Sequence, residues 1–264
     1  MTDKRPIGIF DSGVGGLTVL KEMMKKLPEE NLIYFGDNKR APYGNRKNEE
    51  VLRFCGEIAS FLRGLDIKLL VIACNTATVV CLEKLQKTLD IPVVGVIIPG
   101  TKEALELTRV KKIGVFATPL TAESDTYKKE AQKIDKDVEV YQVGCEPFCR
   151  MIESDWEDTV ENQKIMKHYV KKMPSDIDVV VFGCTHYPII KELFQRELKG
   201  KRWVNPARET TREVRKKLIE LKIENKNNIK RDISFYTSGN VEEFKRLSEK
   251  ILGESIIKIE NALK

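Results

Sequence analysis

Several features that mark metalloproteins, secreted proteins and membrane proteins are missing from this 264-residue sequence. It has only two histidines and no Cys-x-x-Cys pair, and the spacings of Cys145 to Cys149 and of Cys184 to His186 are poor for a structural zinc site. Its first residues, MTDKRPIGIF, contain no apolar signal-peptide core, and no apolar run approaches ~18 residues. We therefore expect a cytoplasmic protein with reduced cysteines, no membrane partner and no bound metal.

The common nucleotide-binding patterns are also absent. The segment FDSGVGG is close to the dinucleotide fingerprint Gly-x-Gly-x-x-Gly, but Thr18 stands where the third glycine is needed, and there is no Walker motif. We expect these glycines to let the backbone approach a small ligand instead, with Asp11 and Ser12 as polar contacts.

The charge balance is mild, with 46 basic and 40 acidic residues and a net charge of +6. In the densest basic stretch, residues 199–231, arginine and lysine alternate with glutamate at helical spacing, which is typical of a solvated helix face. Because few aromatic residues are interleaved there, we expect no nucleic-acid partner, and nucleic-acid binding remains only an alternative side activity of this stretch.

What the sequence does contain is a regular alternation of short apolar runs and helical patterns. Strands are predicted at residues 7–10 and 68–73 and in the segments NLIYFGD, PVVGV, KKIGVFATP, DVEVYQV, DIDVVVF and DISFY. Helices are predicted at residues 17–27, after the 68–73 strand up to about residue 89, and near residues 101–107. This pattern is typical of βαβ units, so we predict an α/β fold with parallel sheets and a site beyond the carboxyl ends of the strands.

The two halves of the chain repeat one another. PIGIFDSG opens the first half and KIGVFATP the second. A cysteine that ends an apolar strand follows 67 positions after Ile7, as Cys74 in LLVIACNTAT, and 71 positions after Ile113, as Cys184 in VVVFGCTHYP. Two related α/β units that face each other would bring both thiols to one cleft from opposite sides.

Two opposed thiols suit the exchange of a proton at a stereocentre, because one group must remove the proton from one face while another returns it on the other face. With a reference pKa of ~8.5, either thiol becomes a thiolate after a modest shift. The alternative role of a strand cysteine is packing, and we expect that role for Cys55, Cys81, Cys145 and Cys149.

Polar residues follow both thiols. An extended backbone through CTHYP would place Cys184 and His186 on one face, where the imidazole can exchange a proton with the thiol or with a bound carboxylate. Thr76 and Thr185 offer hydroxyls, and helix N-termini behind the strands can hold a carboxylate. The segment YFGDNKRAPYGNR is either a surface turn or a cleft wall that carries Asp37, Tyr43 and Gly44. His168 lies in an amphipathic helix and is expected at the surface.

With these motifs in view, the sequence closely resembles the glutamate racemases, the cofactor-independent enzymes that supply D-glutamate for bacterial peptidoglycan. The matching segments, in order over nearly the whole chain, are GIFDSGVGGLTVL, YFGDNKRAPYGNR, ACNTAT, GVIIPG, GCTHYP and FYTSGN. The resemblance implies an isomerase in which Cys74 takes the proton from D-glutamate and Cys184 takes it from L-glutamate. It implies no cofactor, and it implies that Asp11 and His186 assist the thiols.

The resemblance also assigns residues to the substrate. The implied contacts are Asp11, Ser12, Tyr43, Gly44, Asn75, Thr76, Thr118, Thr121, Thr185 and His186. Thr118 and Thr121 resemble residues that hold one carboxylate. Asp37 and Glu153 match positions proposed to support the acid/base chemistry.

For the fold, the resemblance implies two pseudo-symmetric flavodoxin-like domains with the active site in the cleft between them. It suggests one domain of residues 1–97 plus 208–264, a second domain of residues 98–207, and a homodimer. Ile98 and Asn205 depart from the acidic residues that are common at these positions in the family.

Two alternatives are weighed against this function. A racemase of the same superfamily that acts on aspartate or hydantoins should lack the Asp-Ser-Gly motif, and a non-catalytic binding protein would be free to lose one of the two thiols.

Overall fold

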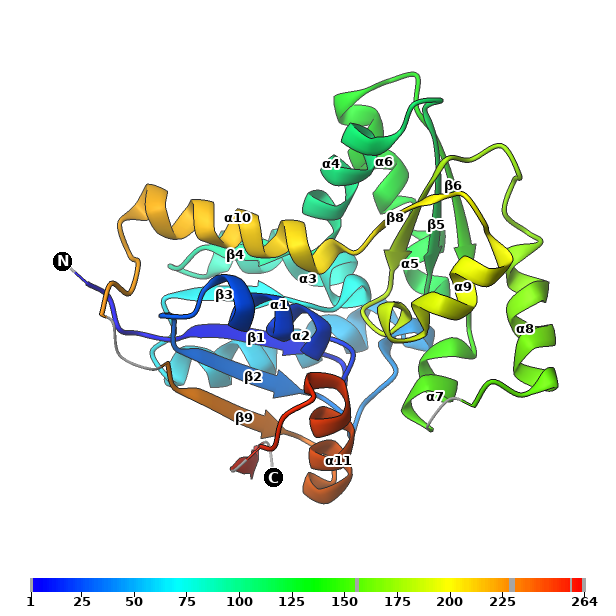
Figure 1. The fold of residues 1–264 in the computed structure, drawn as a ribbon. Helices are drawn as coiled ribbons and strands as arrows, with labels where there is room; N and C mark the ends of the chain where they lie inside the picture. Colours follow the sequence, from blue (N-terminus) through cyan, green and yellow to red (C-terminus); the bar gives the residue numbers. More distant parts are fainter. Residues whose placement is uncertain (1, 155–156, 228–230, 257, 263–264) are drawn as a thin grey trace.

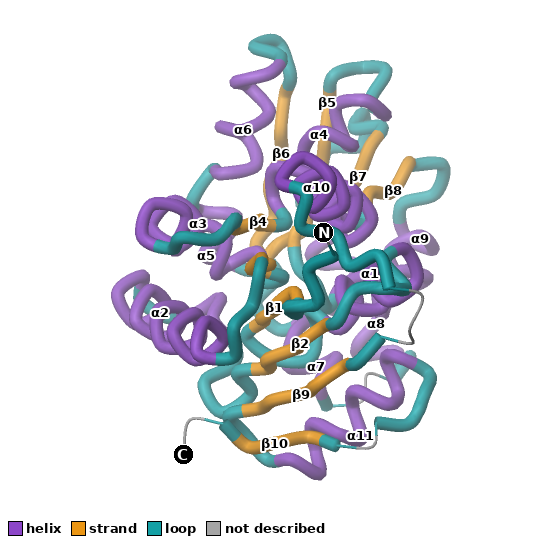
Figure 2. The backbone as a smooth tube through the Cα atoms, turned by 90° about the vertical axis from the view of Figure 1, so that its left-hand side faces the viewer, coloured by secondary structure: helices purple, strands orange, loops and turns teal. Residues whose placement is uncertain are grey.

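The computed structural model describes residues 2–154, 157–227, 231–256 and 258–262, and it contains two β-sheets (Figures 1 and 2). The first sheet has the strand order β10–β9–β2–β1–β3–β4, and the second has the order β6–β5–β7–β8. The strands of the first sheet are β1 (Ile7–Asp11), β2 (Leu32–Gly36), β3 (Leu69–Ile72), β4 (Val93–Gly95), β9 (Ile233–Thr237) and β10 (Ile259–Asn261). Those of the second are β5 (Lys112–Ala117), β6 (Glu139–Gly144), β7 (Val179–Gly183) and β8 (Arg202–Val204). All of these pairings are parallel, so the predicted fold class is confirmed.

Helices connect the strands and cover the sheets. The helices that pack on the first sheet are α1 (Leu17–Lys26), α2 (Asn48–Gly64), α3 (Asn75–Thr88), α10 (Pro206–Leu221) and α11 (Val241–Leu252). The other helices are α4 (Ile97–Leu107), α5 (Pro119–Glu123), α6 (Thr126–Ile134), α7 (Phe148–Glu153), α8 (Val160–Val170) and α9 (Lys191–Glu197), and short 3₁₀ turns form η1 (Tyr43–Asn45) and η2 (Tyr187–Ile190). We call the first sheet with its helices the first lobe, and the second sheet with α4–α9 the second lobe. No helix among the described residues is long and apolar enough to cross a membrane.

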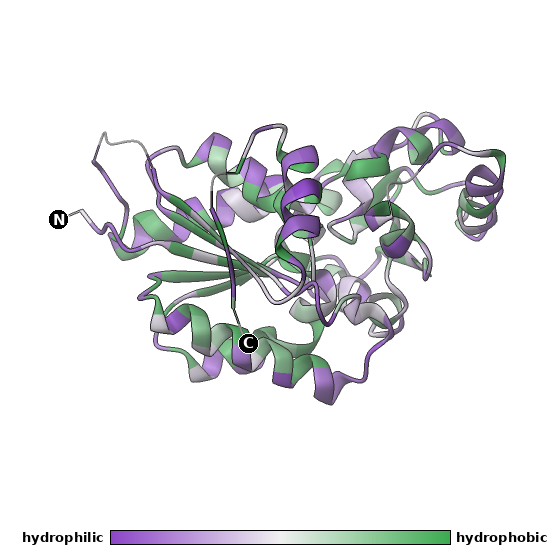
Figure 3. Ribbon diagram, turned by 90° about the horizontal axis from the view of Figure 1, so that it is seen from below, coloured by the Kyte–Doolittle hydropathy of each residue, from purple (hydrophilic) through white to green (hydrophobic). Residues whose placement is uncertain are grey.

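Both faces of each sheet are covered by helices, which is why the central strands β1, β3 and β7 are almost entirely apolar. In β1 the side chains alternate: Ile9 packs with α1, α10 and α11, and Phe10 packs with α2 and α3. Figure 3 shows the apolar strands of the first sheet between helices with hydrophilic outer sides. In the second sheet Val115 packs with α4 and α6, and Phe116 packs with α7, α8 and α9.

The internal repeat is visible in the strand order and in the register. The orders β2–β1–β3–β4 and β6–β5–β7–β8 are equivalent, and both correspond to the flavodoxin-like order. Ile7 pairs with Leu69 and Ile113 pairs with Val179, so each Ile-Gly-x-Phe strand has the same register on its cysteine-ending partner. The repeat therefore places Cys74 and Cys184 at equivalent ends of the two sheets.

The two lobes are linked by an exchange of helices. Helix α4 follows β4 of the first sheet but buries Ile97 and Ala104 against the second sheet. Helix α10 follows β8 of the second sheet but buries Val214 and Leu218 against the first sheet (Figure 1). The division of the chain after residues 97 and 207 stays a prediction, and these two helices are the segments on which it depends.

Candidate active site

The two predicted thiols line one small cavity between the lobes. Cys74 lies between β3 and α3, and Cys184 lies between β7 and η2; both are almost fully buried. The cavity is lined by Ser12, Ala41, Pro42, Tyr43, Gly44, Cys74, Asn75, Thr76, Thr118, Cys149, Glu153, Cys184, Thr185 and His186. Most of the predicted site residues are therefore brought together at the carboxyl ends of the two sheets, where parallel folds bind their ligands.

The cavity is nearly closed. Its volume of about 20 Å³ holds about one water molecule, well below the ~300 Å³ or more of typical ligand sites. Several hydrogen bonds join the two lobes around it, among them Thr185 to Asp11 at 3.3 Å, Tyr127 to Asn75 at 2.8 Å, and Thr76 with Thr118 at 2.9 Å between their hydroxyls. An amino-acid ligand can enter only if these contacts open. A wider hollow of about 990 Å³ lies beside α1, α9 and α11 and includes neither thiol.

The sulfur of Cys74 has hydrogen-bond donors of the first lobe beside it. It is the N-cap of α3, and its Sγ accepts a hydrogen bond from the backbone N–H of Ala77 at 3.4 Å. The hydroxyl of Ser12 lies 3.7 Å from the same sulfur. Burial raises the pKa of the Cys74 thiol and the nearby charge of Asp11 raises it further, whereas the Ala77 and Ser12 donors lower it. This sulfur therefore depends on the helix N-terminus and a hydroxyl to carry negative charge.

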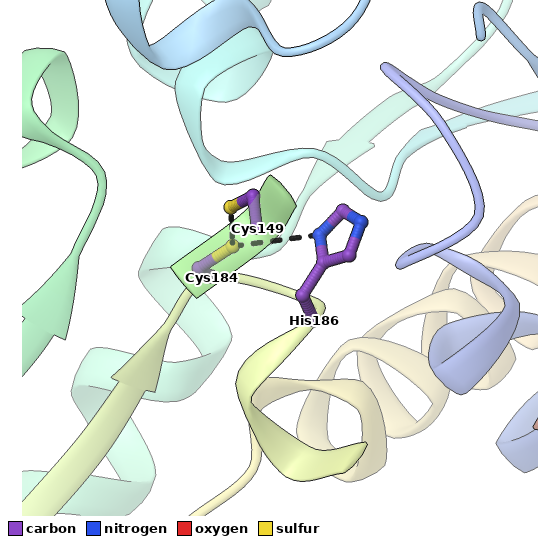
Figure 4. A group of neighbouring side chains, drawn as sticks. All are labelled: Cys149, Cys184 and His186. Atoms are coloured by element: carbon purple, nitrogen blue, oxygen red, sulfur yellow. Dashed lines mark hydrogen bonds between the residues drawn. The ribbon is translucent and has the colours of Figure 1, made fainter. Parts of the chain in front are cut away.

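Cys184 has different neighbours, shown in Figure 4. Its Sγ lies 3.4 Å from Sγ of Cys149 and 3.7 Å from Nδ1 of His186. Burial raises the pKa of the Cys184 thiol well above its ordinary value, Cys149 adds to this, and His186 opposes it. A thiol and an imidazole in contact can share or exchange a proton, which is the arrangement expected of an acid/base pair.

His186 is held on its other side by Glu153, with Nε2 and Oε1 2.9 Å apart. Burial disfavours the charged imidazolium, but the contacts with Cys184 and Glu153 outweigh it and place the pKa of His186 well above its ordinary value. Burial likewise disfavours the carboxylate, but His186 lowers the pKa of Glu153 below its ordinary value. The three side chains therefore form a proton-sharing chain from the sulfur to a carboxylate at the edge of the cavity.

The contact between Cys184 and His186 was predicted for the wrong backbone reason. The sequence pattern suggested an extended chain, but His186 has φ −75° and ψ −32° and is the N-cap of η2. The pair therefore forms where the chain bends directly after β7.

Gly15 of FDSGVGG and Gly44 lie where the two lobes meet, and the approach of the FDSGVGG backbone to a ligand stays a prediction. A Cβ on Gly15 would lie 2.4 Å from Nδ1 of His186 and 2.6 Å from Oγ1 of Thr185. A Cβ on Gly44 would lie 2.6 Å from Cβ of Thr118. These glycines let the first lobe approach the second lobe's site residues.

Three threonine hydroxyls gather at one side of the cavity. Thr76 of the first lobe lies 2.9 Å from Thr118 and 3.3 Å from Thr121, measured between their Oγ1 atoms, and Thr118 and Thr121 lie 3.1 Å apart. Thr121 is fully buried behind the other two and is not among the residues that line the cavity. Such a group can donate several hydrogen bonds to one carboxylate once the lobes part.

Asp11 and Asp37 stand behind the cavity wall. Asp11 is fully buried and accepts hydrogen bonds from Thr185 and, at 3.0 Å, from the N–H of Gly13. Asp37 is also fully buried and binds the Tyr43 hydroxyl and, at 2.7 Å, Nε of Arg40. The YFGDNKRAPYGNR segment is therefore a cleft wall, with Tyr43 and Gly44 facing the cavity and Asp37 supporting Tyr43.

The other sequence predictions concern residues outside the cavity. Cys55 and Cys81 pack in the core as predicted, and His168 is exposed as predicted. Ile98 is 37% exposed, and Asn205 caps α10 by accepting from the N–H of Ala207 at 3.1 Å. The basic stretch carries Arg212–Glu209 and Lys217–Glu220 ion pairs along α10, as expected of a solvated helix face.

For Cys149 the sequence predicted packing in the core but not a contact with the active site. It is buried in the core of the second lobe, as expected, but it also lines the cavity and touches Cys184. The spacing of Cys145 and Cys149 gave no signal of this contact, because the partner is 35 residues away. Tyr127, the hydroxyl donor to Asn75, was missed for the same reason.

The chain resembles known racemases over nearly its whole length. A family model described as Asp/Glu/Hydantoin racemase matches residues 10–214. A glutamate racemase of Bacillus cereus is 41% identical over 254 residues, which cover 96% of this chain and 94% of that protein. The structure of a glutamate racemase isoform of Bacillus anthracis covers 99% of this chain and 98% of its own, with a TM-score of 0.93 and 37% identity. The Francisella tularensis glutamate racemase, solved in complex with D-glutamate, has a TM-score of 0.92 at 32% identity, with coverage of 99% and 98%. This chain therefore belongs to the glutamate racemase family.

Proposed function

We propose that Cys74 and Cys184 are the two acid/base groups with which this chain interconverts L- and D-glutamate. The observation that carries this proposal is the placement of two buried thiols, one from each lobe, in the lining of a single cavity. Each has its own polar partners, so each can alternate between thiol and thiolate without the other. In its family, the product serves peptidoglycan synthesis and hence the bacterial cell wall and cell shape.

Each direction of the reaction begins with one thiolate and one thiol. With L-glutamate bound, Cys184 takes the proton from Cα, and Cys74 returns a proton to the opposite face. With D-glutamate bound, Cys74 takes the proton and Cys184 returns it. Asp11 supports the Cys74 side, and His186, oriented by Glu153, supports the Cys184 side.

The remaining cavity residues bind the two carboxylates and the amino group. Thr76, Thr118 and Thr121 offer hydroxyl donors to one carboxylate. Ser12, Tyr43, Gly44, Asn75 and Thr185 complete the proposed contacts, and Asp37 fixes Tyr43. Binding of D-glutamate by the Francisella tularensis relative supports this choice of substrate.

The direct test is chiral analysis of L-glutamate after incubation with the purified full-length chain, with a chelator and without added pyridoxal phosphate. We expect complete racemisation to equal amounts of the enantiomers, and much slower turnover of aspartate. A requirement for an added cofactor would contradict the two-thiol mechanism, and equal turnover of aspartate would move the substrate assignment to the aspartate racemases.

Two further properties follow from the resemblance to the family. We propose a homodimer, which light scattering on the purified chain tests directly. We also propose that the enzyme works in the cytoplasm, where its six free cysteines stay reduced.

A further inference from the structure

Cys149 is a buried thiol in the active site to which the proton transfer gives no role. Its Sγ lies 3.4 Å from Sγ of Cys184, and Cys184 Sγ lies 3.7 Å from Nδ1 of His186. One ligand atom from each of these three residues lies within 4.8 Å of the others. Figure 4 shows the sulfur of Cys184 between the sulfur of Cys149, on α7, and the imidazole of His186, in the turn after β7. Among the described residues, this is the one close group of three or more Cys, His, Asp or Glu ligand atoms.

The spacing of these atoms corresponds to that of a zinc-type site. Zinc bonds to thiolate sulfur are about 2.3 Å and bonds to imidazole nitrogen about 2.0–2.1 Å, so tetrahedral angles place two sulfurs about 3.8 Å apart and a sulfur and a nitrogen about 3.6 Å apart. The corresponding distances here, 3.4 Å and 3.7 Å, differ from these by a few tenths of an ångström. The third pair, Sγ of Cys149 and the ring nitrogen of His186, lies within 4.8 Å, so a cation between these atoms would require side-chain movements of at most about 1 Å.

The surroundings of the group support the same interpretation. Glu153 binds Nε2 of His186 at 2.9 Å and leaves Nδ1 facing the sulfur of Cys184. A carboxylate on the far nitrogen is the usual means by which proteins orient a metal-binding imidazole. All four side chains line the cavity, so a fourth coordination position would open toward it.

We propose that Cys149, Cys184 and His186 bind a thiophilic divalent cation of the zinc type, and that the bound cation inhibits the racemase. On binding, two protons leave, the one shared between Cys184 and His186 and the one on Cys149, so that both sulfurs ligate as thiolates and the imidazole ligates through neutral Nδ1. Two thiolates then balance the charge of the cation. The sulfur of Cys184 can no longer accept a proton from Cα, so both directions of the reaction stop.

The binding and the inhibition are separable. Binding depends only on the three ligands and on Glu153, whereas the inhibition rests on the proposed role of Cys184. Cys74 offers an internal contrast, because its sulfur is hydrogen-bonded to the hydroxyl of Ser12 and to the N–H of Ala77, neither of which is a metal ligand of this kind.

The test is a titration of the reduced, metal-free full-length chain with Co²⁺, followed by absorption spectroscopy. We expect one equivalent to bind with thiolate-to-cobalt charge-transfer bands and the visible bands of tetrahedral cobalt. Cys149→Val should lower the affinity at least ~tenfold and remove part of the charge-transfer intensity. Cys145→Val is the matched control, because Cys145 is equally buried in the same lobe but its thiol is directed to the carbonyl of Val143, and it should leave the spectrum unchanged.

A wild-type spectrum without charge-transfer bands at one equivalent would overturn the proposal, whether or not the variants fold. Equal affinity in Cys149→Val, or a mass lower by two hydrogens that indicates a Cys149–Cys184 disulfide instead of a metal complex, would overturn it as well. Glu153→Gln provides a second variant, and it should weaken Co²⁺ binding while the charge-transfer bands persist.

Inhibition is measured separately, with Zn²⁺ and a chelator. We expect Zn²⁺ to stop racemisation by the wild-type chain and the chelator to restore it, with at least ~tenfold more Zn²⁺ required in Cys149→Val. If Co²⁺ binds as expected but Zn²⁺ at saturation leaves racemisation intact, the cation site stands and the proposed catalytic role of Cys184 fails.

Discussion

Cys74 and Cys184 occupy equivalent positions in the two halves of the molecule, but their surroundings differ. Each follows the strand that pairs with an Ile-Gly-x-Phe strand in the same register. Cys74 begins a helix of 14 residues and has a hydroxyl beside it. Cys184 is followed by a 3₁₀ turn of four residues and has an imidazole and a second thiol beside it. The repeat duplicated the position of the thiol but not the group that shares its proton.

In the proposed mechanism, this difference gives each sulfur its own means of carrying negative charge. The thiolate of Cys74 would be stabilised by the N-terminus of α3, whose donors do not titrate. The thiolate of Cys184 would be stabilised by His186 and Glu153, which can take up or release a proton. The comparison predicts that changes on one side affect one half-reaction more than the other.

Replacing either thiol should have the largest effect. We expect Cys74→Ser and Cys184→Ser each to lower racemisation at least ~10⁴-fold in both directions, because every turnover uses one group as base and the other as acid. A glutamate analogue with a leaving group at Cβ needs only proton removal before it eliminates. Cys184→Ser should therefore still process the D-analogue, and Cys74→Ser should still process the L-analogue, as measured by release of the leaving group. The reverse pairing would show that the faces are assigned wrongly, and a single variant that processes both would rule out two bases.

Replacing the partners of the thiols should separate the two sides. His186→Asn should slow elimination from the L-analogue about 10²–10³-fold and from the D-analogue much less, because the imidazole lies beside Cys184 and Cys74 has other hydrogen-bond partners. Asp11→Asn should instead slow elimination from the D-analogue more than elimination from the L-analogue. The overall equilibrium constant is fixed, so racemisation itself must fall equally in both directions. Equal effects of each variant on both eliminations would show that the partners are shared and that the comparison is wrong.

A smaller effect on catalysis is expected when a side chain is added at Gly15, where the two lobes approach each other closely. Gly15→Ala would place a methyl group 2.4 Å from Nδ1 of His186, so the ring must move by about 1 Å and kcat should fall up to ~10²-fold. The loss should again be larger with the L-analogue. Gly56→Ala, in α2, is the matched control, because nothing lies within 4 Å of its added Cβ. It should leave kcat unchanged and stabilise the chain by about 0.5–1 kcal/mol.

The smallest effect concerns stability away from both thiols. Burial and the charge of Glu209 on α10 raise the pKa of Glu103 on α4 from 4.5 to about 7. The folded chain therefore binds a proton that the unfolded chain has released between these pH values, and the free energy of unfolding falls as pH rises from 4.5 to 7. Glu103→Gln removes this dependence.

We expect Glu103→Gln to gain on the order of 1 kcal/mol over the wild type between pH 5 and pH 8, measured by urea unfolding. Glu83→Gln is the control, because the Glu83 side chain is 89% exposed, and its effect should not change with pH. Neither variant should alter the ratio of the two elimination rates, so an altered ratio in Glu103→Gln would mean that the thiol asymmetry depends on how α4 and α10 pack.

The sequence by itself determined the elements and their repetition. Apolar runs such as residues 68–73 predict buried parallel strands because both faces of the sheet are covered, and their hydrophobicity is a local property. The Ile-Gly-x-Phe and Cys motifs recur at similar spacing, so the sequence also places Cys74 and Cys184 at equivalent strand ends.

The tertiary structure decided which groups meet at those ends. Cys149 approaches Cys184 because α7 packs against the η2 turn that follows β7, and no local pattern encodes a contact between residues 35 positions apart. His186 reaches the same sulfur because the chain turns after β7, where the sequence suggested an extended segment. Hydrophobic periodicity records whether a side chain is buried, whereas the identity of its neighbour depends on how sheets and helices pack, and that packing distinguishes the two thiols.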